Sequence, residues 1–384
     1  MWHRKGRNFL LLTEIFFSFL VLFITGTLII EGLRDYYTPV GFDYSDLYEI
    51  DMSRHGEGKA SSLAKLQQLR PILASTPEIS SYSFSSSNTP FSYSTMNVDM
   101  YYEEKMELSH FYRVDPSYFE TLDLELLEGR WLQKGDVGSP EPVVINQTLA
   151  ERYFPQQSAL GKRIGQFNDK NNMQVVGVIR NYRQDGEFQA ADNALFRFHN
   201  EQDTTSEVPG KILLEIKAGA DPAWQQQLME RLNKVAGNWT LELAVVTHMR
   251  KAKAKMKLIP LIALSIVCGF LVFNVALGLF GVLWYNISKR YAEIGIRRAF
   301  GATESSIRWQ MLGEVMVLAT LGLVLGVLLA VQFPLLGVMN VTTSIYAISI
   351  ATSLLLIYLL VALCAWYPSK QAAQIEPALA LHYE

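Results

Sequence analysis

The sequence predicts an α+β domain that is inserted into a unit of four membrane-spanning helices. Two uncharged runs predict the membrane unit, because residues 258–288 and 315–369 contain no Asp, Glu, Lys or Arg. The inserted domain is predicted from residues 31–257, which carry 25 basic and 31 acidic residues and alternate strand-like with helix-like segments. The rest of the chain carries 9 basic and 6 acidic residues. The two uncharged runs exclude a wholly soluble fold. The chain as a whole also lacks the excess of basic residues that is typical of nucleic-acid-binding proteins.

Four apolar segments are long enough to cross a bilayer, which takes about 20 helical residues. The first, residues 9–30, follows a short basic leader and is too long for the apolar part of a cleaved signal peptide. The second lies within residues 258–285. The third and fourth lie near residues 311–333 and 344–366, because Pro334 divides the longer uncharged run.

The distribution of Lys and Arg predicts the orientation, since short loops rich in these residues stay in the cytoplasm. The leader has three, and the segment between the second and third spans has five. We therefore expect both termini in the cytoplasm and residues 31–257 on the outer side of the membrane. Five more basic residues lie in 250–257. We expect them to form a solvated collar, with a specific anionic-ligand site as the alternative.

The predicted domains are residues 1–30 (leader and first span), 31–250 (the inserted domain) and 251–384 (a stalk, three spans, a cytoplasmic helix and the tail). Both cysteines, Cys268 and Cys364, lie in the uncharged runs, so the inserted domain depends on a packed core without disulfides. Residues 181–210 are polar and predict a mobile loop. The pattern predicts strands at 47–52, 79–86, 106–114, 142–146, 173–179, 211–217 and 239–246, and helices at 60–75, 147–153 and 222–235.

The sequence lacks the motifs that would support catalysis or cofactor binding. There is no G-x-x-x-x-G-K-[ST], so any ATP that is used must be bound by another subunit. The six histidines include no H-E-x-x-H and have no neighbouring cysteines, and there is no G-x-S-x-G. We expect a non-catalytic chain with no metal and no cofactor of its own.

The predicted spans contain few ionisable groups. Only Glu14 and Glu314 occur, each near a cytoplasmic end, where a solvated interfacial carboxylate is expected. This argues against a proton- or sodium-coupled carrier. Small residues at Gly278, Gly281, Gly322 and Gly326 allow close helix packing, either within the chain or between two copies.

Between the second and third spans, residues 287–300 predict a short amphipathic helix along the inner membrane surface. Gly301 would end it, and Thr303 would cap the next helix with Glu304 at its positive end. Taken alone, this pattern favours a surface anchor.

Several stretches resemble a known family. RYAEIGIRRAFGAT and the C-terminal YPSKQAAQIEPALALHYE resemble the FtsX-like permease core of MacB-type ABC transporters. FYRVDPSYFETLDLELLEGR, PVVINQTLAERYFPQQSALGKRI and MQVVGVIRNYR resemble the periplasmic core domain of the same family. The matches follow the family order of one span, a periplasmic domain and three spans. The nucleotide-binding domain of MacB is missing, so the chain is similar to permease-only members such as FtsX and LolC/LolE.

The resemblance implies a permease of the bacterial inner membrane that pairs with a second copy or a paralogue. Each permease would bind an ABC ATPase subunit that holds ATP and Mg. Conformational changes that accompany ATP hydrolysis would be transmitted through the helices to the periplasmic domain, a mechanism called mechanotransmission. Arg297 and Arg298 would contact acidic groups of the ATPase, with lipid headgroups as the alternative. By the match, the ATPase-coupling residues are Glu293, Ile294, Gly295, Arg297, Arg298, Gly301 and Ala302.

The function that this implies is the export, efflux or extraction of a hydrophobic or amphipathic molecule, with or without a periplasmic adaptor and an outer-membrane channel. The alternative is a signalling permease that controls cell-wall hydrolases or senses antimicrobial peptides. A third option is a membrane-anchored binding protein without an energy source. The aromatic stretch 82–102 is expected to be core or edge strand, with a binding surface as the alternative.

Overall fold

The computed structural model describes residues 2–86, 88–167, 169–188, 191–200 and 207–373. The chain divides into two compact units. One, the membrane unit, comprises Met1–Arg34 and Leu258–Glu384, and the other, the inserted domain, comprises Asp35–Lys257. An α+β domain therefore lies between the first and second spans, which confirms the predicted fold class.

In the described residues of the membrane unit, four helices are long and apolar enough to cross a bilayer. They lie within Leu11–Tyr36, Val246–Val282, Glu304–Leu335 and Thr343–Gln371, which confirms the four predicted spans. Pro334 falls in a short helix at the predicted division. The helices are α1 (Trp2–Tyr37), α6 (Val246–Lys289), α7 (Tyr291–Ala299), α8 (Glu304–Ala330), α9 (Gln332–Leu335), the 3-10 turn η1 (Val338–Asn340) and α10 (Thr343–Ala373).

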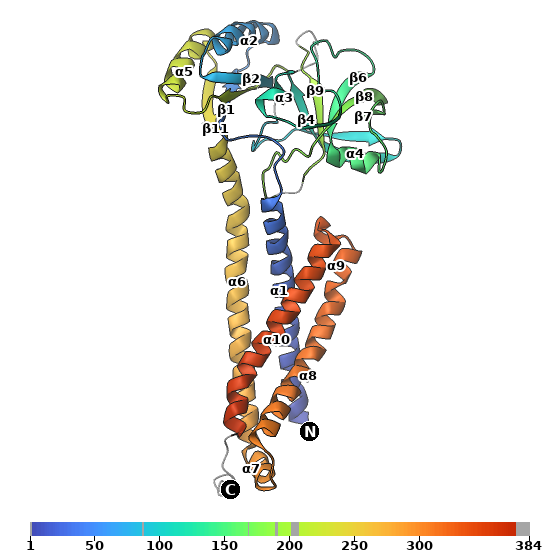
Figure 1. Ribbon diagram of the computed structural model, residues 1–384, viewed down its shortest axis with the longest axis vertical. Coiled ribbons are helices and arrows are strands. Elements are labelled where there is room, and N and C mark those ends of the chain that lie inside the picture. The colour runs from blue at the N-terminus through green and yellow to red at the C-terminus, as the bar shows by residue number, and fades with distance from the viewer. Residues whose placement is uncertain (1, 87, 168, 189–190, 201–206, 374–384) are drawn as a thin grey trace. The chain divides into compact units, whose positions relative to one another are not determined.

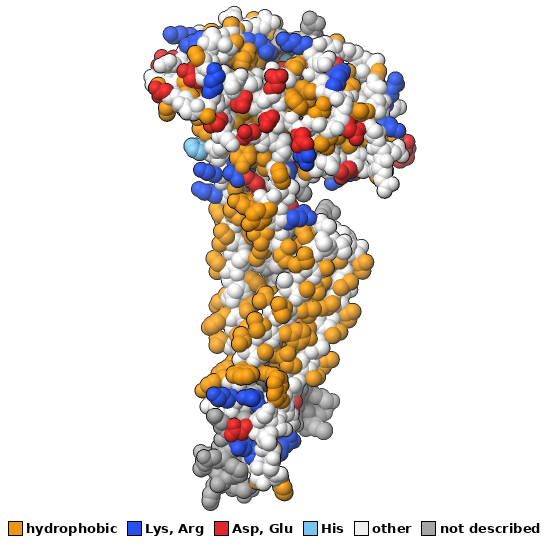
Figure 2. Space-filling view, viewed as in Figure 1, with side chains coloured by type: hydrophobic (Ala, Val, Ile, Leu, Met, Phe, Trp, Pro, Cys, Tyr) orange, Lys and Arg blue, Asp and Glu red, His pale blue; other side chains and the backbone are white. Residues whose placement is uncertain are grey.

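The helices of the membrane unit pack around apolar side chains of α1. Phe19 and Phe23 are fully buried, in one cluster with Leu323 of α8 and Ile357 of α10. Helices α8 and α10 lie side by side (Figure 1). Figure 2 shows apolar side chains over the visible face of these helices and charged ones gathered near α7, as a lipid-facing surface requires.

The inserted domain has two lobes. The first, the four-stranded lobe, is an antiparallel sheet in the order β11, β1, β10, β2. Two helices, α2 and α5, lie side by side against it (Figure 1) and bury Leu69 and Leu232 with Ile50 and Phe84 of the sheet. The elements are β1 (Leu47–Ser53), α2 (Lys59–Ala74), β2 (Ile79–Ser85), β10 (Lys211–Ile216), α5 (Ala223–Ala236) and β11 (Thr240–Val245).

The second, the ring lobe, closes six strands on themselves in the order β4, β3, β7, β8, β6, β9 and back to β4. Each of these six strands therefore pairs with two neighbours in the ring, and the sheet closes on itself. The elements are β3 (Asn97–Tyr102), β4 (Lys105–Val114), α3 (Tyr118–Thr121), β5 (Leu126–Gly129), which pairs with β8, β6 (Glu141–Asn146), α4 (Gln147–Tyr153), β7 (Arg163–Gln166), β8 (Asp169–Ile179) and β9 (Ala194–Phe198).

A shared core joins the two lobes. It contains Leu213 of β10, Phe196 of β9, Tyr112 of β4 and Tyr182, and it includes Val246 at the start of α6. The first residue of the long helix is therefore part of the hydrophobic core of the inserted domain.

Two predictions about local structure were wrong. Residues 181–210 are not all loop, because β9 lies there and its first three residues are buried; residues 189–190 and 201–206 of the stretch lie outside the described residues. The sequence did not indicate β9 because a strand of five residues is too short to change the average polarity of a 30-residue stretch. Residues 287–300 are not one helix either, because α6 runs to Lys289 and the backbone breaks at Arg290, where φ is −104° and ψ is 15°.

The aromatic stretch 82–102 is largely core. Phe84 and Phe91 are fully buried, Tyr101 and Tyr102 belong to β3, and Tyr93 is exposed. The strand β3 in this stretch was not predicted from the sequence. Neither were β5 and β7 further along the chain, since each of these has only four residues.

Candidate functional site

The predicted coupling residues lie together in α7 and in the turn that follows it. Ile294, 2% exposed, and Gly295 form the buried face of this helix. Glu293 and Arg297 lie on the exposed face and form an ion pair of 2.7 Å one turn apart. Arg297 also donates a hydrogen bond of 2.9 Å to Gln310 of α8, so α7 is held against the helix that follows it.

Gly301 ends α7 with a backbone conformation that other residues seldom adopt. Its φ is 96°, and its N–H donates to the carbonyl of Arg298 at 3.0 Å. The N–H of Ala302 donates to the carbonyl of Arg297, also at 3.0 Å. Phe300, beside this turn, is 89% exposed. A large exposed aromatic side chain is suited to docking a protein partner.

The start of α8 is capped as the sequence predicts. The Thr303 hydroxyl accepts a hydrogen bond of 3.2 Å from the backbone N–H of Ser306. Glu304 follows in the first turn and accepts a hydrogen bond of 3.4 Å from Arg298. The turn between α7 and α8 thus has a fixed conformation.

Two of the predicted packing glycines, Gly322 and Gly326, lie against α1. A Cβ atom on Gly322 would lie 3.2 Å from the carbonyl oxygen of Leu12, and one on Gly326 would lie 2.4 Å from the ring of Phe19. This G-x-x-x-G therefore packs within the chain. Its backbone approaches α1 because neither glycine carries a side chain.

The other two glycines differ from each other. A Cβ atom on Gly278 of α6 would lie 2.5 Å from the Glu14 carboxylate, so Gly278 makes room for this acidic group of α1. A Cβ atom on Gly281 would meet no atom within 4 Å. Glu314, the second carboxylate in the spans, forms an ion pair of 2.7 Å with Arg290 at the α6–α7 break.

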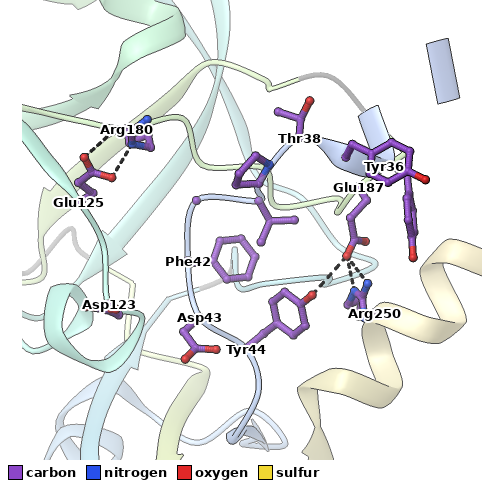
Figure 3. Close-up of a pocket in the computed structure, with 14 residues that line it drawn as sticks. Tyr36, Thr38, Phe42, Asp43, Tyr44, Asp123, Glu125, Arg180, Glu187 and Arg250 are labelled. Atoms are coloured by element: carbon purple, nitrogen blue, oxygen red, sulfur yellow. Dashed lines mark hydrogen bonds and ion pairs between the residues drawn. The ribbon is translucent and has the colours of Figure 1, made fainter. Parts of the chain in front are cut away.

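A second group of charged residues lies where α6 leaves the inserted domain. Arg250 forms an ion pair with the buried carboxylate of Glu187, which also accepts a hydrogen bond of 3.4 Å from Tyr44 (Figure 3). Lys253 forms an ion pair with Asp185. The predicted solvated collar is therefore wrong for Arg250 and Lys253, whereas Lys251, Lys255 and Lys257 are exposed as expected.

The sequence analysis missed the acidic partners, Asp185 and Glu187, because they lie in the stretch predicted as loop. One signal was available: Arg250 and Lys253 are three residues apart and therefore share a helix face. A cavity of about 700 Å³ lies beside the Arg250–Glu187 pair (Figure 3). Its walls include Tyr36, Phe42, Tyr44, Asp43 and Asp123.

No group of three or more His, Cys, Asp or Glu side chains that could hold a metal occurs among the described residues. The surfaces at α7 and at the start of α6 are built from ion pairs, caps and aromatic rings.

Comparison with known proteins assigns the chain to a family. A family model described as the MacB-like periplasmic core domain matches residues 20–232, more than half of the chain, and one described as the FtsX-like permease C-terminal matches residues 265–377. The chain belongs to the MacB-like family of ABC transporter permeases. The predicted resemblance is thereby confirmed in both parts of the chain.

Among the relatives of this MacB-like permease is the uncharacterized ABC transporter permease YvrN of Bacillus subtilis (strain 168), 26% identical over 71% of this chain and 70% of the relative. The macrolide export ATP-binding/permease protein MacB of Bdellovibrio bacteriovorus is 27% identical over 63% of this chain. The match spans only 38% of that MacB. A crystal structure of the periplasmic region of MacB from Actinobacillus actinomycetemcomitans matches 57% of this chain and 97% of its own, at 16% identity and a TM-score of 0.40.

Proposed function

We infer that this MacB-like permease is the membrane subunit of an ATP-driven complex. A separate ATPase subunit binds the α7 turn, and its ATP cycle changes the conformation of the inserted domain. The complex exports or extracts a hydrophobic or amphipathic molecule, which does not pass between the spans. ATP and Mg are bound by the ATPase and not by this chain.

The surface of α7 is the observation that carries this proposal. Its buried face, Ile294 and Gly295, fixes the helix, while Phe300, Glu293 and Arg297 remain exposed. Side chains that are fixed and exposed before binding lose little conformational entropy when a partner docks. We assign this surface to the ATPase and place it, with both termini, in the cytoplasm of a bacterial inner-membrane protein.

Helix α6 supports a mechanical connection. It is one helix of 44 residues that starts in the core of the inserted domain and ends just before α7. At 1.5 Å per residue it is about 66 Å long. Residues 258–288 of α6 contain no charged side chain, so this part of the helix lacks the ionisable groups that usually mark a pathway for polar cargo.

The partnership with an ATPase is tested by isolating the full-length tagged permease from its native membranes. We expect an ATPase subunit to be retained, and Phe300→Ala to reduce the retained amount more than about tenfold, as loss of a central aromatic contact does. The same variant should keep its thermal stability, because Phe300 is almost fully exposed. Charge reversal of Arg297 and Arg298 should also release the ATPase.

The matched control is Arg308→Ala, a basic residue on the next helix whose guanidinium stacks on Trp366 at 5.3 Å. It should retain the ATPase. If no ATPase accompanies the wild-type chain, or if the Phe300 and arginine variants retain it fully, the proposal is wrong. Deletion of the gene then separates the two roles, since export predicts altered drug tolerance and signalling predicts altered cell-wall hydrolysis.

A further inference from the structure

Residues 181–188, which begin two positions after the end of β8, contact both segments that connect the inserted domain to its helices. We call them the β8 loop. Its sequence is Asn-Tyr-Arg-Gln-Asp-Gly-Glu-Phe. Successive side chains of this loop bind different elements of the inserted domain, and all of these contacts lie within that domain.

Arg183 of the β8 loop holds the end of α1. Its side chain is 2% exposed, and its guanidinium donates to the carbonyl oxygens of Asp35 at 2.8 Å and Thr38 at 2.9 Å. Its backbone N–H donates to the carbonyl of Val40 at 2.8 Å. The last carbonyls of a helix lack partners within it and carry partial negative charge. A buried guanidinium at this point satisfies both the hydrogen bonds and the charge.

Asp185 and Glu187 hold the start of α6. Glu187 pairs with Arg250, and Asp185 pairs with Lys253, one turn further along the same face of α6. The Lys253 ammonium also donates to the carbonyl of Ser92 at 2.5 Å. The β8 loop thus presents a cation to α1 and two anions to α6.

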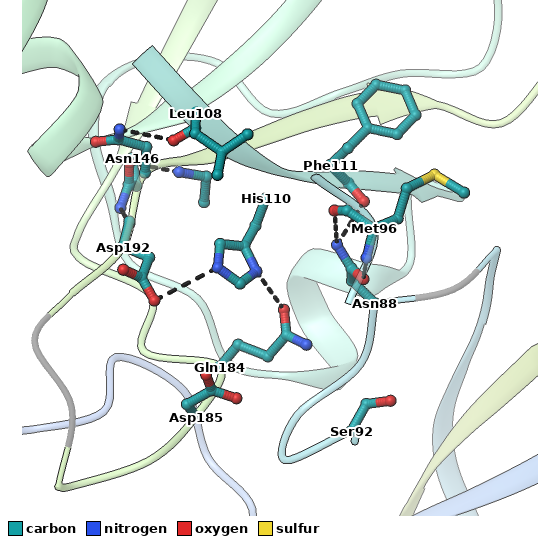
Figure 4. Close-up of polar contacts among 12 residues, drawn as sticks. Asn88, Ser92, Met96, Leu108, His110, Phe111, Asn146, Gln184, Asp185 and Asp192 are labelled. Atoms are coloured by element: carbon teal, nitrogen blue, oxygen red, sulfur yellow. Dashed lines mark hydrogen bonds and ion pairs between the residues drawn. The ribbon is translucent and has the colours of Figure 1, made fainter. Parts of the chain in front are cut away.

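The remaining side chains fix the β8 loop to the ring lobe and to the shared core. The Gln184 amide oxygen accepts a hydrogen bond of 3.2 Å from Nδ1 of His110 on β4 (Figure 4). It accepts another from the hydroxyl of Tyr112 on the same strand. The Tyr182 hydroxyl lies 2.9 Å from that of Tyr118, and its ring is buried in the shared core.

The first residue of the β8 loop is fixed as well. Asn181 accepts a hydrogen bond of 2.9 Å from the backbone N–H of Thr148 in α4. Most of these groups are buried, and separating a buried polar group from its partner is costly. The β8 loop therefore cannot move without the elements that it binds.

We propose that the β8 loop is the element through which movements of α1 and α6 reach the ring lobe, and that Arg183, Asp185 and Glu187 are its positioning residues. The proposal rests on the ATP-driven function inferred above. If α1 or α6 moved while the β8 loop stayed in place, the ion pairs and hydrogen bonds between them would break and leave buried charges unpaired. If the β8 loop moves together with the helices, every pair is kept. The ring lobe consequently follows the helices.

The test measures hydrogen–deuterium exchange in the inserted domain of the permease–ATPase complex, isolated with the full-length chain, with and without Mg-ATP. In wild type we expect a nucleotide-dependent change in exchange over β4 and β9. In Arg250→Ala/Lys253→Ala this change should be lost while the ATPase activity of the complex persists. Both residues are only partly buried, so the variant should fold.

The matched control is Lys251→Ala/Lys255→Ala, which removes two exposed charges from the same turns of α6 and should behave as wild type. The single variant Asp185→Lys should lose the change, and the exchanged pair Asp185→Lys/Lys253→Asp should restore it. A purely structural ion pair would instead lower the melting temperature and leave the nucleotide-dependent change intact.

The outcomes are distinguishable. If the wild-type complex shows no nucleotide-dependent change in the inserted domain, the ATP-driven function is wrong, and the role of the β8 loop is rejected with it. If wild type and Arg250→Ala/Lys253→Ala change equally, the function stands and the role of the β8 loop alone is rejected.

Discussion

At the scale of single residues, Glu57 shows how one carboxylate joins separate elements of the four-stranded lobe. It accepts a hydrogen bond of 2.7 Å from Lys65 of α2 and further ones from Ser61 and from the indole of Trp239, just before β11. The hydrogen bonds, that from Lys65 above all, lower the pKa of Glu57 from 4.5 to about 2. The ionised form is therefore favoured in the folded state.

This lowered pKa predicts how stability depends on pH. Since the folded pKa of Glu57 lies below the unfolded one, its contribution is fully present above pH 4.5 and is lost as the pH falls toward 2. Glu57→Gln should lower the melting temperature at pH 7 and should match wild type near pH 2, measured by thermal unfolding across this range. Glu104→Gln, at an exposed position, is the control. A melting-temperature difference that is the same at both pH values would contradict the prediction.

Asp115 is the opposite case at the same scale. It is buried between the lobes, and burial raises the pKa of its carboxyl. The Ser83 hydroxyl, 2.5 Å away, and the backbone N–H of Phe84, 3.1 Å away, donate to it and oppose part of this rise. Asp115 thus connects β2 to the end of β4, and it also forms an ion pair of 3.6 Å with Arg70 of α2.

At the scale of elements, the contact of α8 with α1 depends on the absence of side chains. Gly326 lies against Phe19, which is fully buried. Small residues on α8 therefore set the distance between these two helices.

Gly326→Val should consequently destabilise the membrane unit by about 1–3 kcal/mol, the usual cost of overpacking a filled core. The melting temperature in detergent measures this. Gly281→Val is the matched control, since a Cβ atom there meets no atom within 4 Å. Pairing Gly326→Val with Phe19→Leu should recover part of the loss. An unchanged melting temperature for Gly326→Val would show that the contact with α1 is not tight.

At the scale of the whole molecule, the four spans and the distribution of Lys and Arg predict that both termini lie on one side of the membrane and the inserted domain on the other. In a chain without Cys268 and Cys364, a cysteine at Gln227 on α5 should react with a membrane-impermeant maleimide in intact spheroplasts. A cysteine at Phe300 should react only after lysis. The reverse pattern would overturn the orientation that the Lys and Arg distribution predicts.

The inserted domain has its own hydrophobic clusters and should fold by itself if both connecting segments are kept. We expect residues 35–257 to unfold cooperatively when heated. Residues 41–245 lack Asp35, Thr38 and Arg250, so Arg183 loses its hydrogen bonds to the end of α1 and Glu187 loses its ion pair, and the melting temperature should fall substantially. Circular dichroism measures both unfolding transitions. Equal melting temperatures would show that the connecting segments add nothing to the domain.

The sequence alone determined the four spans, the inserted α+β domain and most of its longer elements, because length, uncharged runs and alternating polarity are local signals. Helix α4 lies where the pattern predicts it, and Gly301 and Thr303 end α7 and cap α8 as their residue types require. The coupling role of the α7 turn stays a prediction, which rests on a resemblance carried by consecutive residues.

Only the tertiary structure decided which distant residues meet. No local pattern pairs Arg250 with Glu187, 63 residues earlier, or brings Arg183 to the end of α1, 148 residues from Asp35. The short strand β9 and the closed ring of strands were decided there too, because strand pairing depends on partners far along the chain. Local chemistry fixes what each segment can form, and the packing of segments that are distant in sequence fixes which buried charges find partners.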